Sequence, residues 1–155
     1  MKKLEVISLS IITLLCLTFC EEQEPLELSD GLQVKVGQTC GWCHGTEEMI
    51  ITYETSSYQY NYACGDSLDV PEFFFATDDE DWIILQQYYA SGIFQKERLN
   101  SCGVCADGCD YWIRYIDGDY EHEIRFQNPE NIQNSATRNV AIRFVERLEA
   151  LNEDE

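Results

Sequence analysis

The chain has 155 residues, with 10 Lys and Arg against 29 Asp and Glu, so its formal net charge is −19; hydrophobic residues make up 45% of it. This length is typical of one domain, and the hydrophobic content is sufficient for a packed core. The negative charge argues against a nucleic-acid backbone or an anionic lipid surface as partner, because both attract Lys and Arg. We therefore expect no nucleic-acid partner.

The first 19 residues have the pattern of a signal peptide. Lys2 and Lys3 are followed by an apolar run over residues 6–19. A membrane-spanning helix needs roughly 20 apolar residues, so this run is short for a span but typical of the apolar part of a signal peptide. The sequence therefore predicts an exported protein.

The end of the apolar run, Leu17-Thr18-Phe19-Cys20, resembles a bacterial lipobox, although Phe19 stands where a small residue is usual. The resemblance implies that Cys20 is lipidated and becomes the first residue of the mature chain. The acidic run at 21–24 resembles the surface-export signal of Bacteroidota lipoproteins. We expect a lipid anchor in the bacterial cell envelope, at the outer membrane and on its surface side.

These features predict the division of the chain. Residues 1–19 form the signal peptide, 20–33 an acidic tether, 34–152 a single domain and 153–155 an acidic tail.

The first predicted hairpin has strands at 49–54 and 58–64, joined by a turn at 55–57. The second strand alternates, which places four side chains on one face. We expect this face to cover the core, since Tyr suits a half-buried sheet surface. Its members are Tyr58, Tyr60, Tyr62 and Cys64.

A helix is predicted over 78–90. Thr77 is expected to cap it, with Glu80 reaching back in a capping box, and Gly92 to end it. Trp82, Leu85 and Tyr89 form its apolar stripe.

The second half of the chain repeats this order. Strands at 111–116 and 120–126 flank Asp117-Gly118-Asp119, a strong hairpin signal. After a turn or short helix at Asn128-Pro129, a helix is predicted over 136–151. The predicted fold is therefore α+β, in the order ββα-ββα, with two helices on one face of an antiparallel sheet and disulfides between loops and strand ends.

Six cysteines remain once Cys16 is removed and Cys20 is lipidated: Cys40, Cys43, Cys64, Cys102, Cys105 and Cys109. An even number in an exported chain predicts disulfides. Six cysteines allow 15 connectivities, and the sequence leaves the choice open.

Two other uses of these cysteines are open. Cys40, Cys43 and His44 have the Cys-x-x-Cys-His spacing of a c-type haem attachment site. Alternatively, Cys40, Cys43, Cys102 and Cys105 form two Cys-x-x-Cys pairs that could bind zinc as four thiolates. A redox role for the 40–43 pair is disfavoured, since Glu47 and Glu48 would raise the pKa of a nearby thiol. The disulfide hypothesis accounts for all six and needs no cofactor.

Two motifs carry a further resemblance. Gly37-Gln-Thr-Cys-Gly-Trp-Cys43 precedes the first hairpin, and Cys102-Gly-Val-Cys-Ala-Asp-Gly108 precedes the aromatic strand Tyr111-Trp-Ile-Arg-Tyr. Over about residues 34–150 the chain resembles small cysteine-containing lipoproteins of Bacteroidota. That resemblance implies no particular activity.

No catalytic set stands out in the sequence. The two histidines, His44 and His122, are in neither a Gly-x-Ser-x-Gly nor a His-Glu-x-x-His motif. We therefore expect an envelope-anchored binding or structural module rather than an enzyme, with a protein or glycan partner. Trp42, on the first cysteine loop, is the candidate ligand contact.

Overall fold

A computed structural model describes residues 31–41, 45–61 and 72–153. Within them the chain forms a six-stranded antiparallel sheet, two α-helices and three short 3₁₀ turns. The elements are β1 (Gln33–Cys40), β2 (Gly45–Ile51), β3 (Thr55–Asn61), β4 (Phe73–Ala76), α2 (Asp79–Ala90), η1 (Phe94–Lys96), η2 (Val104–Ala106), β5 (Cys109–Asp117), β6 (Tyr120–Phe126), η3 (Pro129–Asn131) and α3 (Ser135–Glu153).

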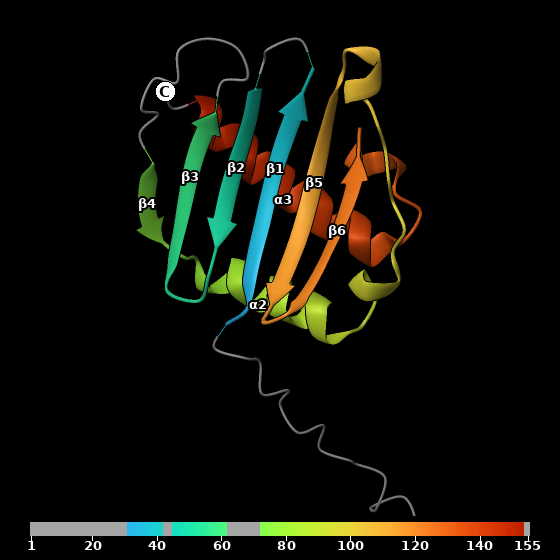
Figure 1. Cartoon of the computed structure of the whole chain (residues 1–155). Helices are drawn as coiled ribbons and strands as arrows, with labels where there is room; N and C mark the ends of the chain where they lie inside the picture. The colour runs from blue at the N-terminus through green and yellow to red at the C-terminus, as the bar shows by residue number, and fades with distance from the viewer. Residues whose placement is uncertain (1–30, 42–44, 62–71, 154–155) are drawn as a thin grey trace, which may run out of the picture.

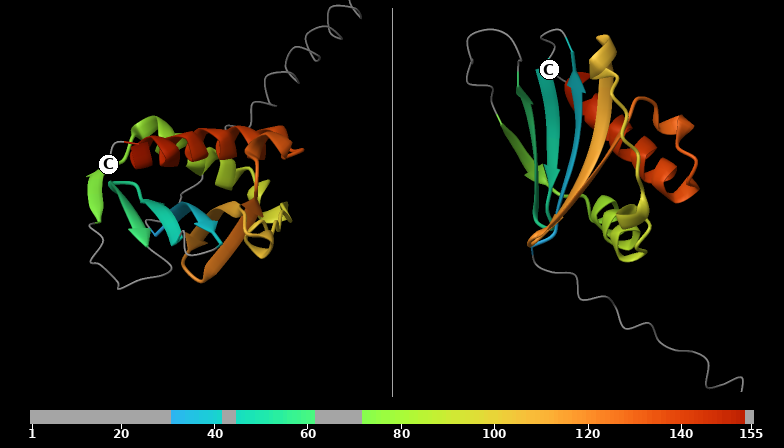
Figure 2. Two further views of the ribbon diagram at one scale, coloured as in Figure 1. Left: turned by 90° about the horizontal axis from the view of Figure 1, so that it is seen from above. Right: turned by 45° about the vertical axis from the view of Figure 1, so that its right-hand side comes forward.

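The sheet has the strand order β4-β3-β2-β1-β5-β6, with β4 and β6 at its edges (Figure 1). Both helices lie against the same face of the sheet, as the view along it shows (Figure 2). The predicted α+β class and its antiparallel sheet with two helices are confirmed. The predicted order ββα-ββα is wrong, because β1 and β4 add two strands to the first half.

β1 lies at the centre of the sheet, between β2 and β5. Val34 and Val36 alternate onto the helix face and are fully buried there. Leu32, directly before the strand, is also in the core, so the packed region includes the last residues of the predicted tether. The apolar alternation Leu32-Val34-Val36 is short, because the next position on this face is the polar Gln38, and the sequence therefore gives only a weak strand signal.

The first predicted hairpin exists, but its turn comes earlier than expected. β2 ends at Ile51 and β3 begins at Thr55, so Tyr53 and Glu54 form the tip rather than residues 55–57. Thr52 and Thr55 close this turn: the Thr52 hydroxyl donates to the Thr55 carbonyl over 2.7 Å and accepts from the Thr55 amide over 3.2 Å. Hydroxyl side chains commonly compete for backbone groups in this way at turns.

The first helix starts one residue later than the predicted cap implies. Asp78, not Thr77, caps α2, and its carboxylate accepts from the backbone N–H groups of Glu80 and Asp81. The Thr77 hydroxyl instead donates to the Thr52 carbonyl over 2.8 Å, which ties the helix entry to the β2–β3 turn. At the other end Gly92 has φ +67°, a conformation that glycine adopts without strain.

The second half matches its prediction closely. β5 and β6 pair around Gly118, which has φ +57° as an Asp-Gly hairpin turn requires. Asn128 caps the short turn that begins at Pro129. The helix after it carries the expected stripe, with Val140, Phe144 and Leu148 buried.

The core lies between the sheet and the two helices. Its centre is aromatic: Tyr115 on β5 is fully buried, with the rings of Phe94 and Tyr89 at 4.4 Å and 5.3 Å between centroids. The Tyr115 hydroxyl donates to the Leu85 carbonyl of α2. Tyr58 is in this core, and Tyr60 is half-buried on the same face.

A charged residue also links the two helices. Asp81 on α2 is buried and accepts from Arg143 over 2.7 Å and from Arg147 over 3.1 Å, both on α3.

No helix among the residues that the structure describes is long and apolar enough to cross a membrane.

Candidate functional site

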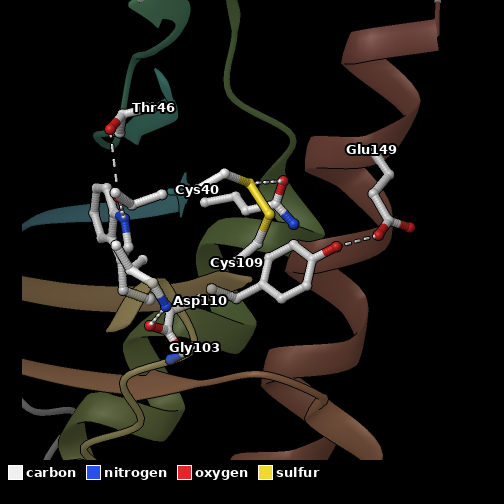
Figure 3. The surroundings of a disulfide bond; sticks show 11 residues. Cys40, Thr46, Gly103, Cys109, Asp110 and Glu149 are labelled. Carbon is white, nitrogen blue, oxygen red and sulfur yellow. Dashed lines mark hydrogen bonds between the residues drawn. A yellow bond between two sulfur atoms is a disulfide. The ribbon is translucent and has the colours of Figure 1, made fainter. Parts of the chain in front are cut away.

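Four of the six predicted cysteines form two disulfides at one end of the sheet. Cys40 ends β1 and bonds to Cys109, its register partner at the start of β5 (Figure 3). Cys102 bonds to Cys105, three residues away, on the loop that leads to β5. Cys20, Trp42, Cys43, His44, Tyr62 and Cys64 lie outside the described residues.

These bonds bear on the uses of the cysteines that the sequence left open. The haem hypothesis needs a thioether at Cys40, and the zinc hypothesis needs thiolates at Cys40, Cys102 and Cys105. A sulfur in a disulfide has no valence left for a thioether and lacks the charge of a thiolate ligand. Both alternatives are incompatible with this arrangement. No cluster of metal-ligating side chains occurs among the described residues.

Asp110 organises the loop between the two disulfides. Its carboxylate is 1% exposed and accepts from the Ser101 hydroxyl over 2.7 Å, the Gly103 amide over 2.8 Å and the Val104 amide over 3.1 Å. Burial acts to raise the pKa of this carboxyl, but the three hydrogen bonds to its ionised form outweigh burial and lower it. Asp110 therefore fixes the path of the Cys102–Cys105 loop.

We expect Asp110→Asn to lower the free energy of unfolding by about 1.5–3 kcal/mol, the usual contribution of hydrogen bonds to a charged group. Because the pKa of folded Asp110 is below the ordinary value of 3.8, the stabilisation is present above that pH and is lost as the pH falls through the folded pKa. Urea denaturation of both proteins at neutral and at acidic pH measures this. A difference between them that stayed constant down to strongly acidic pH would contradict the role of the ionised carboxylate.

Two phenol–carboxylate pairs lie beside the Cys40–Cys109 disulfide, on the helix face of the sheet. The Tyr111 hydroxyl donates to Glu149 of α3 over 2.6 Å (Figure 3), and Tyr58 donates to Glu47 of β2 over 3.2 Å. Gln38 completes the group, 3.6 Å from the Cys40 sulfur. Burial raises the pKa of Glu47, which is 5% exposed, and repulsion from Glu149 raises it further, although the Tyr58 hydrogen bond lowers it.

We expect Glu47→Gln to stabilise the protein near neutral pH. The pKa of folded Glu47 is above the ordinary value of 4.5, so stability falls as the pH rises from 4.5 through the folded pKa. The amide removes this penalty and still accepts from Tyr58. Chemical denaturation should show a higher midpoint for the variant near neutral pH and little gain below pH 4.5. An equal gain at both pH values would show that ionisation of Glu47 is not the cause.

The face of the sheet away from the helices carries paired charges. Lys35 on β1 lies 3.5 Å from Glu48 on β2, and Arg114 on β5 lies 2.6 Å from Glu123 on β6. Arg125 also contacts Glu123. Since these side chains neutralise one another, this face presents little net charge to a ligand.

Three exposed aromatic residues lie on or next to the edge strand β4, where Phe73 and Phe74 point to opposite faces of the sheet. Tyr53, at the β2–β3 tip, is 69% exposed; Phe73 and Phe74, on β4, are 45% and 67% exposed. We call these three residues the aromatic edge. β4 pairs with β3 on one side, and no described strand pairs with its other side. The aromatic edge was not predicted from the sequence, although the run Phe73-Phe74-Phe75 is a signal for it.

His122 is the only histidine among the residues that the structure describes. His122, which the sequence placed on a strand, packs its ring against Phe94 and lies 3.0 Å from the Glu97 carbonyl. These contacts of His122 are therefore those of a packing residue, and none of them is to a nucleophilic side chain. Neither a protein-family model nor a curated protein matches this chain.

Proposed function

We propose that this protein is an exported, lipid-anchored module that binds an extended segment of another protein along its aromatic edge. The observation that carries the proposal is the exposure of Phe73 and Phe74 on an edge strand whose outer side has no described partner strand. Large exposed aromatics at an open strand are a common feature of binding surfaces, because an added strand gains both backbone hydrogen bonds and buried apolar area.

The charges around this edge favour a basic partner. Glu54, Glu72, Asp78 and Asp79 are exposed beside the aromatic edge, and the chain as a whole has a net charge of −19. A segment with alternating apolar and Lys or Arg side chains complements both features. A glycan could stack on the same rings, but it would not use the open backbone of β4.

Export is supported by the cysteines and by the first residues of the chain. Cys40–Cys109 and Cys102–Cys105 are disulfides, which persist in exported proteins and are rare in the cytosol. The apolar run before Cys20 supplies the export and anchoring signals. If Cys20 carries lipid, metabolic labelling with a fatty acid should label the wild-type protein and fail in Cys20→Ser; labelling of that variant would refute the anchor.

Binding can be tested with defined peptides. An extended peptide of alternating Val and Lys should shift the backbone NMR signals of β4, whereas a peptide of alternating Val and Glu should not. Phe74→Ser should abolish the effect, because it removes an exposed aromatic side chain of the edge strand. The variant should still fold, since the Phe74 side chain is mostly exposed and the core does not depend on it. Ile83→Ser is the matched control, because Ile83 is an exposed apolar residue on α2 rather than on the strand, and it should retain binding.

Two results would contradict the proposal. Equal binding by the wild type and Phe74→Ser would exclude the aromatic edge. Binding of oligosaccharides, but of neither peptide, would show that the partner is of the other class.

A further inference from the structure

The Cys102–Cys105 disulfide differs from Cys40–Cys109 in its accessibility. Cys102 and Cys105 are both exposed, on the short turn before β5 (Figure 1), whereas Cys40 and Cys109 are half-buried. Exchange of a disulfide requires a thiolate to approach one of its sulfurs directly. The outer disulfide is therefore open to attack and the inner one is shielded.

The loop that carries the outer disulfide has a second means of support. The Asp110 carboxylate accepts from Ser101, Gly103 and Val104. Backbone bonds at 2.9 Å also join the amides of Ala106 and Gly108 to the Gly103 carbonyl. None of these bonds involves a sulfur atom, so the loop can keep its path when the disulfide opens.

Gly103 shows how closely this loop is packed. An added Cβ at this position would lie 2.6 Å from the Cys109 carbonyl oxygen and 2.7 Å from Gln127 Nε2. The loop backbone is therefore held against β5 and the residue that follows β6. This packing also holds the two cysteines near each other after reduction.

The two disulfides also close rings of very different size. Cys102 and Cys105 are 3 residues apart in sequence, and Cys40 and Cys109 are 69 apart. The constraint that a disulfide places on the unfolded chain grows with the length of the closed loop. Opening the outer disulfide therefore removes much less stabilisation than opening the inner one.

From these observations we propose that Cys102–Cys105 is a thiol–disulfide exchange site that accepts two electrons from an external dithiol. This role is independent of the binding surface proposed above. In the first step a partner thiolate attacks one sulfur, forms a mixed disulfide with it and releases the other cysteine as a thiolate. The second thiolate of the partner then breaks the mixed disulfide. The partner leaves oxidised, and Cys102 and Cys105 remain as a reduced pair after taking up two protons.

The test is a titration of the whole oxidised domain with dithiothreitol, followed by alkylation and peptide mapping by mass spectrometry. Cys102 and Cys105 should become labelled first, at a dithiothreitol concentration at which Cys40 and Cys109 stay oxidised, because the outer disulfide is exposed and the inner one is half-buried. The far-ultraviolet circular dichroism should not change at that point. In glutathione buffers, the fraction of molecules with reduced Cys102 and Cys105 should change as the ratio of reduced to oxidised glutathione is changed.

Three results would overturn the proposal. They are joint reduction of both disulfides with loss of the fold, reduction of Cys40–Cys109 first, and a pair that stays oxidised in every glutathione buffer. The double variant Cys102→Ala with Cys105→Ala provides a second measurement. It should fold with an unchanged spectrum, and failure to fold would show that this disulfide is a structural element.

Discussion

Replacing both Cys40 and Cys109 with alanine should lower the free energy of unfolding by about 4 kcal/mol, as loop-closure entropy predicts for a closed loop of this size. The two cysteines are 69 residues apart in sequence and join the central strand β1 to β5. Without the bond, the unfolded chain gains the freedom of the segment between residues 40 and 109. The folded sheet keeps its β1–β5 hydrogen bonds and its core, so the domain should still fold.

The matched control is the double alanine variant of Cys102 and Cys105. It removes a disulfide between two residues that are only 3 apart in the sequence. By the same relation its cost should be only about 2 kcal/mol. Urea denaturation of both variants under identical conditions gives the two values. Equal costs would mean that the two bonds stabilise the domain through native packing rather than through the unfolded chain.

Gly37→Val should lower the free energy of unfolding by about 3 kcal/mol, the upper part of the usual range for an overpacked site. Gly37 is on β1, where its register partner on β5 is Trp112. A Cβ at Gly37 would lie 2.3 Å from Cζ2 of the Trp112 ring and 2.5 Å from the Glu47 carbonyl oxygen. The indole therefore occupies the space that any larger side chain would need.

The indole cannot easily move aside. Trp112 is 4% exposed, its ring N–H donates to the Thr39 hydroxyl over 3.1 Å, and the Arg114 guanidinium lies 5.5 Å from the ring centre. Moving the ring would break this hydrogen bond and expose the buried indole. The valine variant must therefore displace either the indole or the β2 backbone.

Two comparisons isolate this effect. Lys35→Val changes the same strand and the same face two residues earlier, and should cost no more than about 1 kcal/mol, since it removes one half-exposed ion pair. In a Trp112→Ala background, Gly37→Val should cost less than in the wild type, although the contact with Glu47 remains. If the cost were the same in both backgrounds, the indole would not be the obstacle.

The face of the sheet opposite the helices depends on such pairings. The indole of Trp112 lies over glycine, and Arg114 is shared between Glu121 and Glu123. These residues alternate with core residues along the same strands. The side chains of this face therefore contact one another and need no covering element. The edge of the sheet is the better candidate for a binding surface.

The elements that the sequence predicted correctly are those with local signals. The β5–β6 hairpin followed from strict alternation and one Asp-Gly turn, and α3 from its apolar stripe. Each signal lies within about 20 residues, and its physical cause is local: backbone geometry at glycine or the periodicity of a helix face. The α+β class followed from the same elements.

The elements that the sequence missed depend on distant partners. β1 is a strand because β2 and β5 pair with both of its edges and the core takes Val34 and Val36. β4 is a strand because β3 offers an edge to Phe73–Ala76, a run that is apolar throughout and shows no alternation. The cap of α2 moved to Asp78 because the Thr77 hydroxyl donates to the carbonyl of Thr52, 25 residues earlier.

The cysteines show the same division. Their even number and the signal-like apolar run before Cys20 predicted disulfides, because paired cysteines are the usual arrangement in chains with such a run. Only the tertiary structure paired Cys40 with Cys109 and Cys102 with Cys105, since pairing depends on which strand ends meet in the sheet. It also placed three aromatic residues at an open edge and left one disulfide exposed and the other half-buried, because exposure is decided by neighbours that are distant in the sequence.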